Sequence, residues 1–197
     1  ATLLGSVSGI HEGALLRYRV GSFSAPHLLR AWLEHLALCA CSPQPPAPTH
    51  LLGLKEHQLL RPVAPAEARQ QLAAWLESYL LAFAELALSP DGVASYGLIL
   101  REGTRFPDIA STYVQSVHDF AIRPLMVELE AYQAAGQLQL VDSEFSACAL
   151  LGMVVDDPLR DAILGLTPTL SDERLLLRVR ESVRMFLHEI GRASCRE

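Results

Sequence analysis

Residues 73–90 read AAWLESYLLAFAELALSP, and the hydrophobic pattern of the chain changes within them. Apolar side chains recur here every three or four residues, which is the spacing that gives an α-helix one apolar face. We expect a helix from about residue 66 to residue 88, with this apolar stripe: Leu72, Leu76, Tyr79, Leu80 and Phe83. Strand and helix patterns mix before this helix and only helix patterns follow it. The sequence therefore predicts two domains, residues 1–79 and 80–190, joined near Leu80.

The length and composition allow one large domain or two small ones, with enough apolar surface for a core. Of the 197 residues, 50% are hydrophobic, and 16 Lys+Arg against 22 Asp+Glu give a net charge of -6. A net negative charge gives the chain no overall electrostatic attraction to nucleic acid. The four cysteines are too sparse for a disulfide scaffold, so we expect them reduced. No apolar run approaches the roughly 20 residues of a membrane span, and we expect a cytoplasmic protein.

The front part, residues 1–63, combines short apolar runs with turn residues. TLLGSVSGI (2–10) and ALLRYRVG (14–21) predict a β-hairpin, and THLLGLKEHQLLRPV (49–63) predicts a second. Between them, SAPHLLRAWLEHLALCAC (24–41) has helical spacing behind the start signals Ser24 and Pro26, and predicts an amphipathic helix. The proline-rich SPQPPAP predicts a loop. The front part is therefore an α/β fragment.

The back part shows helix patterns alone. Gly and Pro breaks divide it into five predicted helices: about 66–88, 91–103, 108–135, 143–155 and 171–189. Pro124 falls inside the third and should kink it, because proline has no backbone N–H to donate. The sequence thus predicts an all-α bundle, and a mainly α chain overall.

Residues 1–79 resemble the C-terminal domain of RecC, the gamma subunit of exodeoxyribonuclease V. The resemblance rests on LLRYR (15–19), RAWLEHLALCA (30–40) and RPVAPAEARQQLAAWLESY (61–79). It implies a partial restriction-endonuclease-like fold and a helicase-nuclease partner subunit. Active nucleases of that fold hold magnesium with a strand Asp and a following Asp/Glu-x-Lys.

This chain lacks that set of metal ligands. On the nuclease pattern, Ser8 falls near the first Asp, and Arg17 and Arg19 fall where the acid and the Lys belong. A guanidinium group cannot ligate a cation, and the nearest acid, Glu12, lacks a partner. We therefore predict a non-catalytic pseudo-nuclease without metal or cofactor, and set aside a third hypothesis, a metal-dependent nuclease.

Two other features of the front part have competing interpretations. Arg17, Arg19 and Arg30 are candidates for phosphate contact, but a solvated strand face suits the acidic chain better. His35 and Cys39 lie one helical turn apart, as in some zinc sites. Since Cys39 belongs to the apolar stripe and no second Cys pair follows, we interpret it as a buried thiol that packs as a small hydrophobic group.

Residues 81–190 resemble the C-terminal domain of TetR-family transcriptional regulators. FAELALSPDGVASYGLILREGTRFPDIASTYVQS (83–116) and SDERLLLRVRESVRMFLHEI (171–190) carry the resemblance. It implies a helical domain that binds small apolar effectors and forms a homodimer through its last two helices. That family carries a helix-turn-helix ahead of this domain, and residues 1–79 show no such basic two-helix pattern. We therefore expect no sequence-specific DNA binding from this chain alone.

Apolar positions of the back part provide the candidate site residues. The candidates for effector binding are Tyr96, Leu100, Phe106, Tyr113, Phe120 and Met126. Ordinary core packing is the alternative for each of them, and His118 and Arg123 are either polar anchors or surface residues. The candidates for the dimer interface are Phe145, Leu151, Leu175, Val179, Val183 and Phe186.

The two resemblances meet inside one predicted helix. Domain boundaries usually fall in exposed, polar or Gly/Pro-rich segments, because each domain closes its own core. We therefore hypothesise a chimeric reading frame. EIGRASCRE (189–197) looks like a translated sequencing adapter, and we expect residues 191–197 to be an artefactual tail. The TetR-type effector-binding module is the preferred function, and a non-catalytic RecC-like subunit fragment is the alternative.

Overall fold

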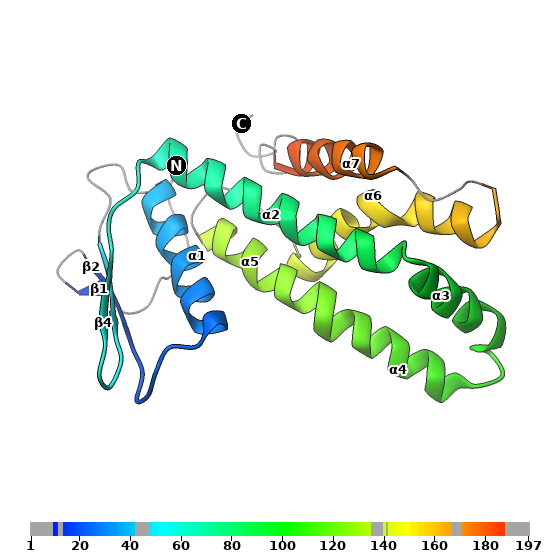
Figure 1. Cartoon of the computed structure of the whole chain (residues 1–197), viewed down its shortest axis with the longest axis horizontal. Coiled ribbons are helices and arrows are strands. Elements are labelled where there is room, and N and C mark those ends of the chain that lie inside the picture. The colour runs from blue at the N-terminus through cyan, green and yellow to red at the C-terminus, as the bar shows by residue number, and fades with distance from the viewer. Residues whose placement is uncertain are drawn as a thin grey trace. The chain divides into compact units, whose positions relative to one another are not determined.

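Most of the described residues are helical, and every strand among them lies before residue 61 (Figure 1). Figure 1 is a computed structural model of the whole chain, which describes these residues: 10–11, 14–41, 48–134, 140, 142–166 and 171–187. The prediction of a mainly helical chain with a small front sheet is confirmed. The predicted tail, residues 191–197, lies outside the described residues.

The chain forms two compact units. One, which we call the sheet unit, contains Ala1–Trp75 and Glu130–Gln139. The other, which we call the helical unit, contains Leu76–Leu129 and Leu140–Glu197. The boundary falls inside helix α2 (Pro65–Ala87), so this one helix contributes residues to both units.

The sheet unit contains a four-stranded sheet in the order β1-β2-β3-β4. The pairs β1/β2 and β3/β4 are antiparallel hairpins, as predicted, and β2 pairs with β3 in parallel. A parallel pair needs a long crossover connection, and helix α1 (Ala25–Cys41) lies in that connection. The strands have these bounds: β1 Ile10–His11, β2 Ala14–Tyr18, β3 Thr49–Leu52 and β4 His57–Leu60.

Helix α1 packs on one face of this sheet. Leu15 of β2 and Leu51 of β3 are buried, and so are Leu33 and Leu36 of α1. Each fully buried leucine contributes about 1.5–3 kcal/mol relative to an exposed one. The apolar face of α1 thus covers the side of the sheet that carries Leu15 and Leu51, which point to the same face because side chains alternate along a strand.

His35 of α1 and Thr49 of β3 are the fully buried polar residues among the described residues of this core. Nε2 of His35 lies 2.8 Å from the carbonyl oxygen of Arg61, and its Nδ1 lies 2.9 Å from the hydroxyl of Thr49. A carbonyl only accepts, so Nε2 carries the proton and Nδ1 accepts from Thr49 in the neutral ring. Burial lowers the pKa of His35, and the hydrogen bond to Arg61 offsets this only in part.

We expect the sheet unit to lose stability as the pH falls below about 6.5, the ordinary pKa of histidine. The pKa of His35 is lower in the folded chain than in the unfolded chain, so the unfolded chain binds this proton more tightly. The contribution of the neutral ring to the free energy of unfolding is therefore fully present only above the pKa of the unfolded chain. The loss is at most about 1.4 kcal/mol per pH unit for one proton. Urea unfolding between pH 7.5 and 5.5 measures it, followed by the fluorescence of Trp32 and Trp75, which both belong to this unit.

His35→Gln should flatten this pH dependence, while the exposed His27→Gln should leave it unchanged. An NMR titration of the His35 ring in the unmodified chain supplies a second readout. Protonation of the folded His35 at or above pH 6.5 would contradict the assignment.

The helical unit is built from the second half of α2 and the helices that follow it. Their bounds are α3 Pro90–Glu102, α4 Pro107–Val117, η1 His118–Ile122, α5 Arg123–Ala134, α6 Ser143–Ile163 and α7 Asp172–Met185, where η1 is a π-helical turn. Within the described residues, no single helix is both long and apolar enough to cross a membrane. Helices α2 and α3 meet that test as a pair, but they are bent by 66° at their break.

Local sequence signals explain where these helices begin. The Ser89 hydroxyl accepts the N–H of Gly92 at 3.0 Å, and Asp142 accepts the N–H of Phe145 at 2.7 Å. Such caps satisfy donors that have no partner inside the helix. Pro90 occupies the first turn of α3, where a missing N–H costs nothing.

Two predicted helices differ from the structure. The predicted helix 143–155 is too short, because α6 continues past Pro158 to Ile163. The predicted helix 108–135 is divided by η1, which ends two residues before Pro124. A π-helical turn inserts one extra residue into a helix, and this one lies where proline removes a backbone donor.

Tyr79 supplies the donor that Pro124 cannot. An N–H at position 124 would bond to the carbonyl four residues earlier, at Phe120. The Tyr79 hydroxyl donates to the carbonyl oxygens of Phe120 at 3.3 Å and Ala121 at 2.8 Å. Burial raises the pKa of Tyr79, so the hydroxyl stays protonated. This contact ties α2 to η1.

Candidate functional site

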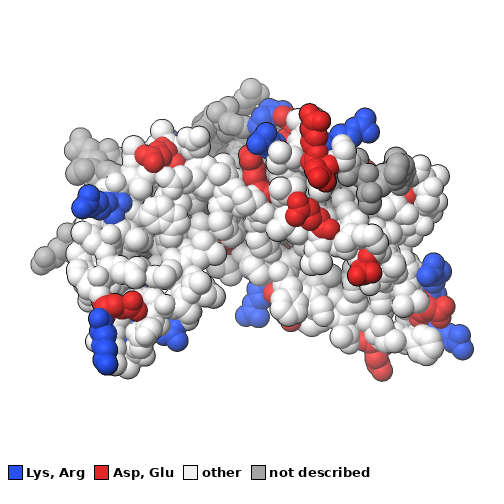
Figure 2. Space-filling view, in the orientation of Figure 1, with Lys and Arg blue, Asp and Glu red and all other residues white. Residues whose placement is uncertain are grey.

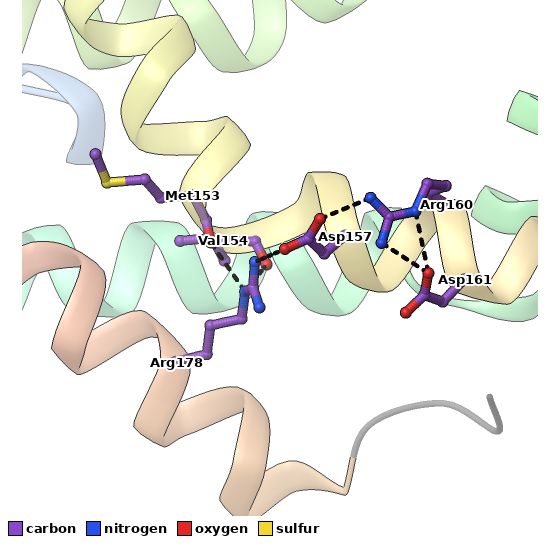
Figure 3. Close-up of polar contacts among 6 residues, drawn as sticks. All are labelled: Met153, Val154, Asp157, Arg160, Asp161 and Arg178. Atoms are coloured by element: carbon purple, nitrogen blue, oxygen red, sulfur yellow. Dashed lines mark hydrogen bonds and ion pairs between the residues drawn. The ribbon is translucent and has the colours of Figure 1, made fainter. Parts of the chain in front are cut away.

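Helix α6 has a proline in its interior, and Arg178 of α7 supplies the donor that this proline lacks (Figure 3). An N–H at position 158 would bond to the carbonyl of Val154. The Nε of Arg178 donates to the carbonyl oxygens of Met153 and Val154, at 2.9 Å each. Since Val154 is fully buried, water cannot easily satisfy its carbonyl. Arg178 therefore fastens α7 to the interior of α6.

Asp157 completes this contact on its solvent side. Its carboxylate accepts Nη2 of Arg178 at 3.3 Å and Nη1 of Arg160 at 2.8 Å (Figure 3). The hydrogen bond from Arg178, followed by that from Arg160, lowers the pKa of Asp157. Arg160 also reaches Asp161 at 2.9 Å. These exposed pairs orient Arg178, whereas exposed ion pairs add little stability by themselves.

Helices α6 and α7 bury most of the residues predicted to form a dimer interface. Five of the six are buried within a single chain: Leu151, Leu175, Val179, Val183 and Phe186. A side chain already buried by its own chain adds little area to a contact between chains. Phe145 is the exception, with 74% of its surface exposed. The six dimer contacts stay predictions, but the apolar stripe of α7 belongs first to the core of the helical unit.

The outer face of α7 is mostly charged. Leu177 is 61% exposed and lies near the middle of this face. Exposed charged side chains occupy the positions around it: Glu173, Arg174, Arg180, Glu181 and Arg184. Arg180 pairs with Glu77 of α2 at 3.6 Å, and Arg184 pairs with Glu181 at 2.8 Å. Charges of both signs therefore surround the exposed leucine.

Two of the six predicted effector residues lie against each other. The rings of Tyr96 in α3 and Tyr113 in α4 are stacked, with centroids 5.7 Å apart. Burial raises the pKa of Tyr113, and the nearby Tyr96 raises it further. Gly97 is buried beside this pair, and a Cβ there would lie 3.9 Å from Ile163 of α6. The two tyrosines thus lie near the place where α3 approaches the end of α6.

The other predicted effector residues are more exposed. Phe120 is 82% exposed, Leu100 and Phe106 are also exposed, and Met126 is half-buried. His118 lies 3.8 Å from Glu144 and 3.4 Å from Asp119, so it joins η1 to the start of α6. The effector assignment of these side chains stays a prediction.

The front arginines are engaged within the sheet unit. Nε of Arg17 donates to Glu34 at 2.6 Å, and Nε of Arg30 donates to the other oxygen of Glu34 at 3.2 Å. Arg19 contacts His27. On the face seen in Figure 2, basic and acidic side chains of the described residues are interspersed. Phosphate contact by these arginines stays a prediction, and Ser8 and Glu12 lie outside the described residues.

His35 and Cys39 approach each other without a third metal ligand. The Cys39 sulfur lies 3.6 Å from Nε2 of His35 and accepts the N–H of Val63 at 3.5 Å. Burial raises the pKa of Cys39, and the Val63 hydrogen bond opposes this. The described part of the chain contains no group of three or more His, Cys, Asp or Glu that could hold a metal ion.

The chain matches two family models, one at each end. Residues 74–189 match the AefR-like transcriptional repressor C-terminal domain, which places the helical unit in the class of TetR-type regulatory domains. Because this match covers more than half of the 197 residues, the chain belongs to the AefR-like transcriptional repressor C-terminal domain family.

The second match concerns the front of the chain. Residues 1–96 match the RecC C-terminal domain, and the two matches overlap at residues 74–96. Both predicted resemblances are therefore confirmed. No curated protein and no solved structure matches the chain.

Proposed function

We propose that residues from near Leu80 to about 190 form the effector-binding and dimerisation module of a TetR-type regulator. The family match over residues 74–189 carries this proposal. TetR C-terminal domains generally dimerise and bind small-molecule effectors. We expect no enzyme activity and no sequence-specific DNA binding from these 197 residues.

The exposed faces of α6 and α7 are the proposed contact with a second copy. Phe145 on α6 and Leu177 on α7 are the large apolar side chains most exposed on these two helices. On α6, Phe145 is followed by Cys148, Ala149 and Gly152, whose small size permits close approach of another helix. The mixed charges around Leu177 allow Glu of one copy to meet Arg of the other.

We expect Phe145→Asp and Leu177→Asp to shift the protein from dimer to monomer, because each places a charge in a contact that excludes water. Sedimentation velocity on the full chain measures the change. Both side chains are exposed in one chain, so thermal stability measured under monomeric conditions should change little.

Leu86→Asp is the matched control, since Leu86 is 70% exposed on α2 of the same unit. It should leave the dimer intact. A monomeric unmodified chain, or a dimer that survives Leu177→Asp, would contradict this interface.

The stacked tyrosines of α3 and α4 are the proposed contact with the effector. Their rings supply apolar area, and each hydroxyl supplies a hydrogen-bonding group at one end. Because the pKa of Tyr113 is raised, its hydroxyl is neutral at physiological pH. A small apolar or amphipathic molecule, with few or no charges, suits such a pair.

We expect small aromatic or aliphatic ligands to raise the midpoint of thermal unfolding as their concentration rises, because they bind the folded chain alone. Tyr113→Ala should reduce the shift by more than half. Tyr18→Ala, which removes an exposed tyrosine of the sheet unit, should leave it unchanged. Equal shifts in both variants would exclude the tyrosine pair as the binding site.

A second candidate function rests on the RecC match at residues 1–96. The sheet unit would then be a non-catalytic fragment that contacts a helicase-nuclease partner. In the described residues, Arg17 lies at the position that the nuclease pattern gives to an acid, and it is paired with Glu34. Binding of the full chain to such a partner, lost on deletion of the front strands but retained in Tyr113→Ala, would favour this function over effector binding.

A further inference from the structure

His50 and His57 face each other across the β3/β4 hairpin of the sheet unit. In this antiparallel pair His50 lies opposite Leu59, and His57 lies opposite Leu52. The two histidines are therefore diagonal neighbours on the same face of the sheet, within reach of each other. Nδ1 of His50 lies 3.1 Å from Nε2 of His57. Neither the core nor the proposed effector contact uses this pair.

The two rings approach each other through these nitrogens. Their planes are 6° apart and their centroids are 5.3 Å apart, well beyond the separation of the facing nitrogens. In the neutral pair one of the facing nitrogens carries a proton and donates a hydrogen bond, and the other accepts that bond. Ring nitrogens are also the commonest protein ligands for transition metals.

We propose that His50 and His57 form an open two-imidazole site for a borderline divalent transition-metal ion such as Ni²⁺ or Zn²⁺. A cation at the usual distance of roughly 2.0–2.1 Å from both nitrogens would make a nitrogen–metal–nitrogen angle of about 98°. This angle lies between those of octahedral and tetrahedral coordination. The separation of the two nitrogens thus matches the bite that such ions require.

Metal binding needs a free lone pair on both facing nitrogens. The ring that donates the shared proton must carry it on its outer nitrogen instead, a tautomer change that solvent can mediate. No net proton is released from the neutral pair. The nitrogens must also turn toward the cation, and because the contact is exposed this turn disturbs no core packing.

The backbone holds the two histidines in place. The N–H of Gly53 donates to the carbonyl of Glu56 at 2.8 Å and closes the hairpin. The Glu56 carboxylate accepts the N–H of Phe23 at 2.7 Å, which anchors the turn to the segment before α1. A site whose ligands are already positioned loses less entropy when it binds.

Two nitrogens leave the remaining coordination positions open. No third His, Cys, Asp or Glu in the described residues joins this pair, so water or a second copy of the chain must complete the shell. Hard cations such as Mg²⁺ and Ca²⁺ prefer oxygen ligands and should not compete.

Titration calorimetry of the full chain with Ni²⁺ alone tests the proposal. We expect saturable binding that weakens at least about tenfold in His50→Gln and in His57→Gln. The double variant should bind Ni²⁺ no more weakly than either single variant, because chelation by two imidazoles is already lost when one of them is removed. His27→Gln, which removes another exposed histidine of the sheet unit, should bind like the unmodified chain.

NMR supplies a readout that does not depend on variants. Paramagnetic Ni²⁺ should broaden the ring resonances of His50 and His57 before those of the other histidines. One ion per chain would assign the open positions to water, and one ion per two chains would assign them to a second copy; either supports the site. Unchanged affinity in both single variants, or broadening that begins at other histidines, would overturn it.

Discussion

Two backbone carbonyls, at Phe120 and Val154, lose their helical donors to prolines four residues later, and the packing of the helical unit depends on how they are satisfied. Leaving a buried carbonyl such as that of Val154 unpaired costs about 1–3 kcal/mol, a large part of the stability of a small domain, whereas the Phe120 carbonyl lies at an exposed contact. The Tyr79 hydroxyl donates to the carbonyl of Ala121 at 2.8 Å and reaches that of Phe120 at 3.3 Å, and Arg178 donates to the carbonyl of Val154. In each case the donor comes from a different helix. Each proline thus makes its own helix dependent on one particular neighbour.

The contact between Arg178 and α6 gives the two faces of α7 different roles. One face carries Arg178 and the buried stripe that includes Val179 and Phe186, so it closes the core against α6. The opposite face is left with Leu177 among charges of both signs. The core face thus holds the unit together, and the outer faces of α6 and α7 are the ones that the proposed dimer would use. The tyrosine pair lies on α3 and α4, apart from both tasks.

Signals within a few residues of one another made much of the fold predictable. The hairpins, the start of α3 behind Ser89 and the start of α6 behind Asp142 follow from turn and capping residues. The parallel pairing of β2 with β3 and the passage of α6 through Pro158 depend on partners distant in sequence. An apolar stripe does not say which helix covers it, so the sequence predicts a dimer contact for the stripe of α7, whereas the structure buries that stripe within one chain. The dimer contact stays a prediction. Tyr96 and Tyr113 are among the predicted effector residues, whereas Arg178 contacts carbonyls 25 and 24 residues away, which no local sequence pattern indicates.

The domain boundary predicted near Leu80 lies within residues 74–96, the part of α2 and α3 that both family matches share. The two compact units also divide inside α2. The helix therefore contributes apolar residues to both cores, such as Leu72 to the sheet unit and Leu80 to the helical unit. The chimeric origin of the reading frame stays a hypothesis.

The most direct test of this account is a double-mutant cycle between Arg178 and Pro158, measured as the free energy of unfolding. Arg178→Met should destabilise the chain by about 1–3 kcal/mol when Pro158 is present, because the Val154 carbonyl loses its donor. With Pro158→Ala, the restored N–H of residue 158 can bond to that carbonyl, so the cost of Arg178→Met should fall by at least about 1 kcal/mol. An equal cost in both backgrounds would contradict the account and assign the effect of Arg178 to its pair with Asp157 instead.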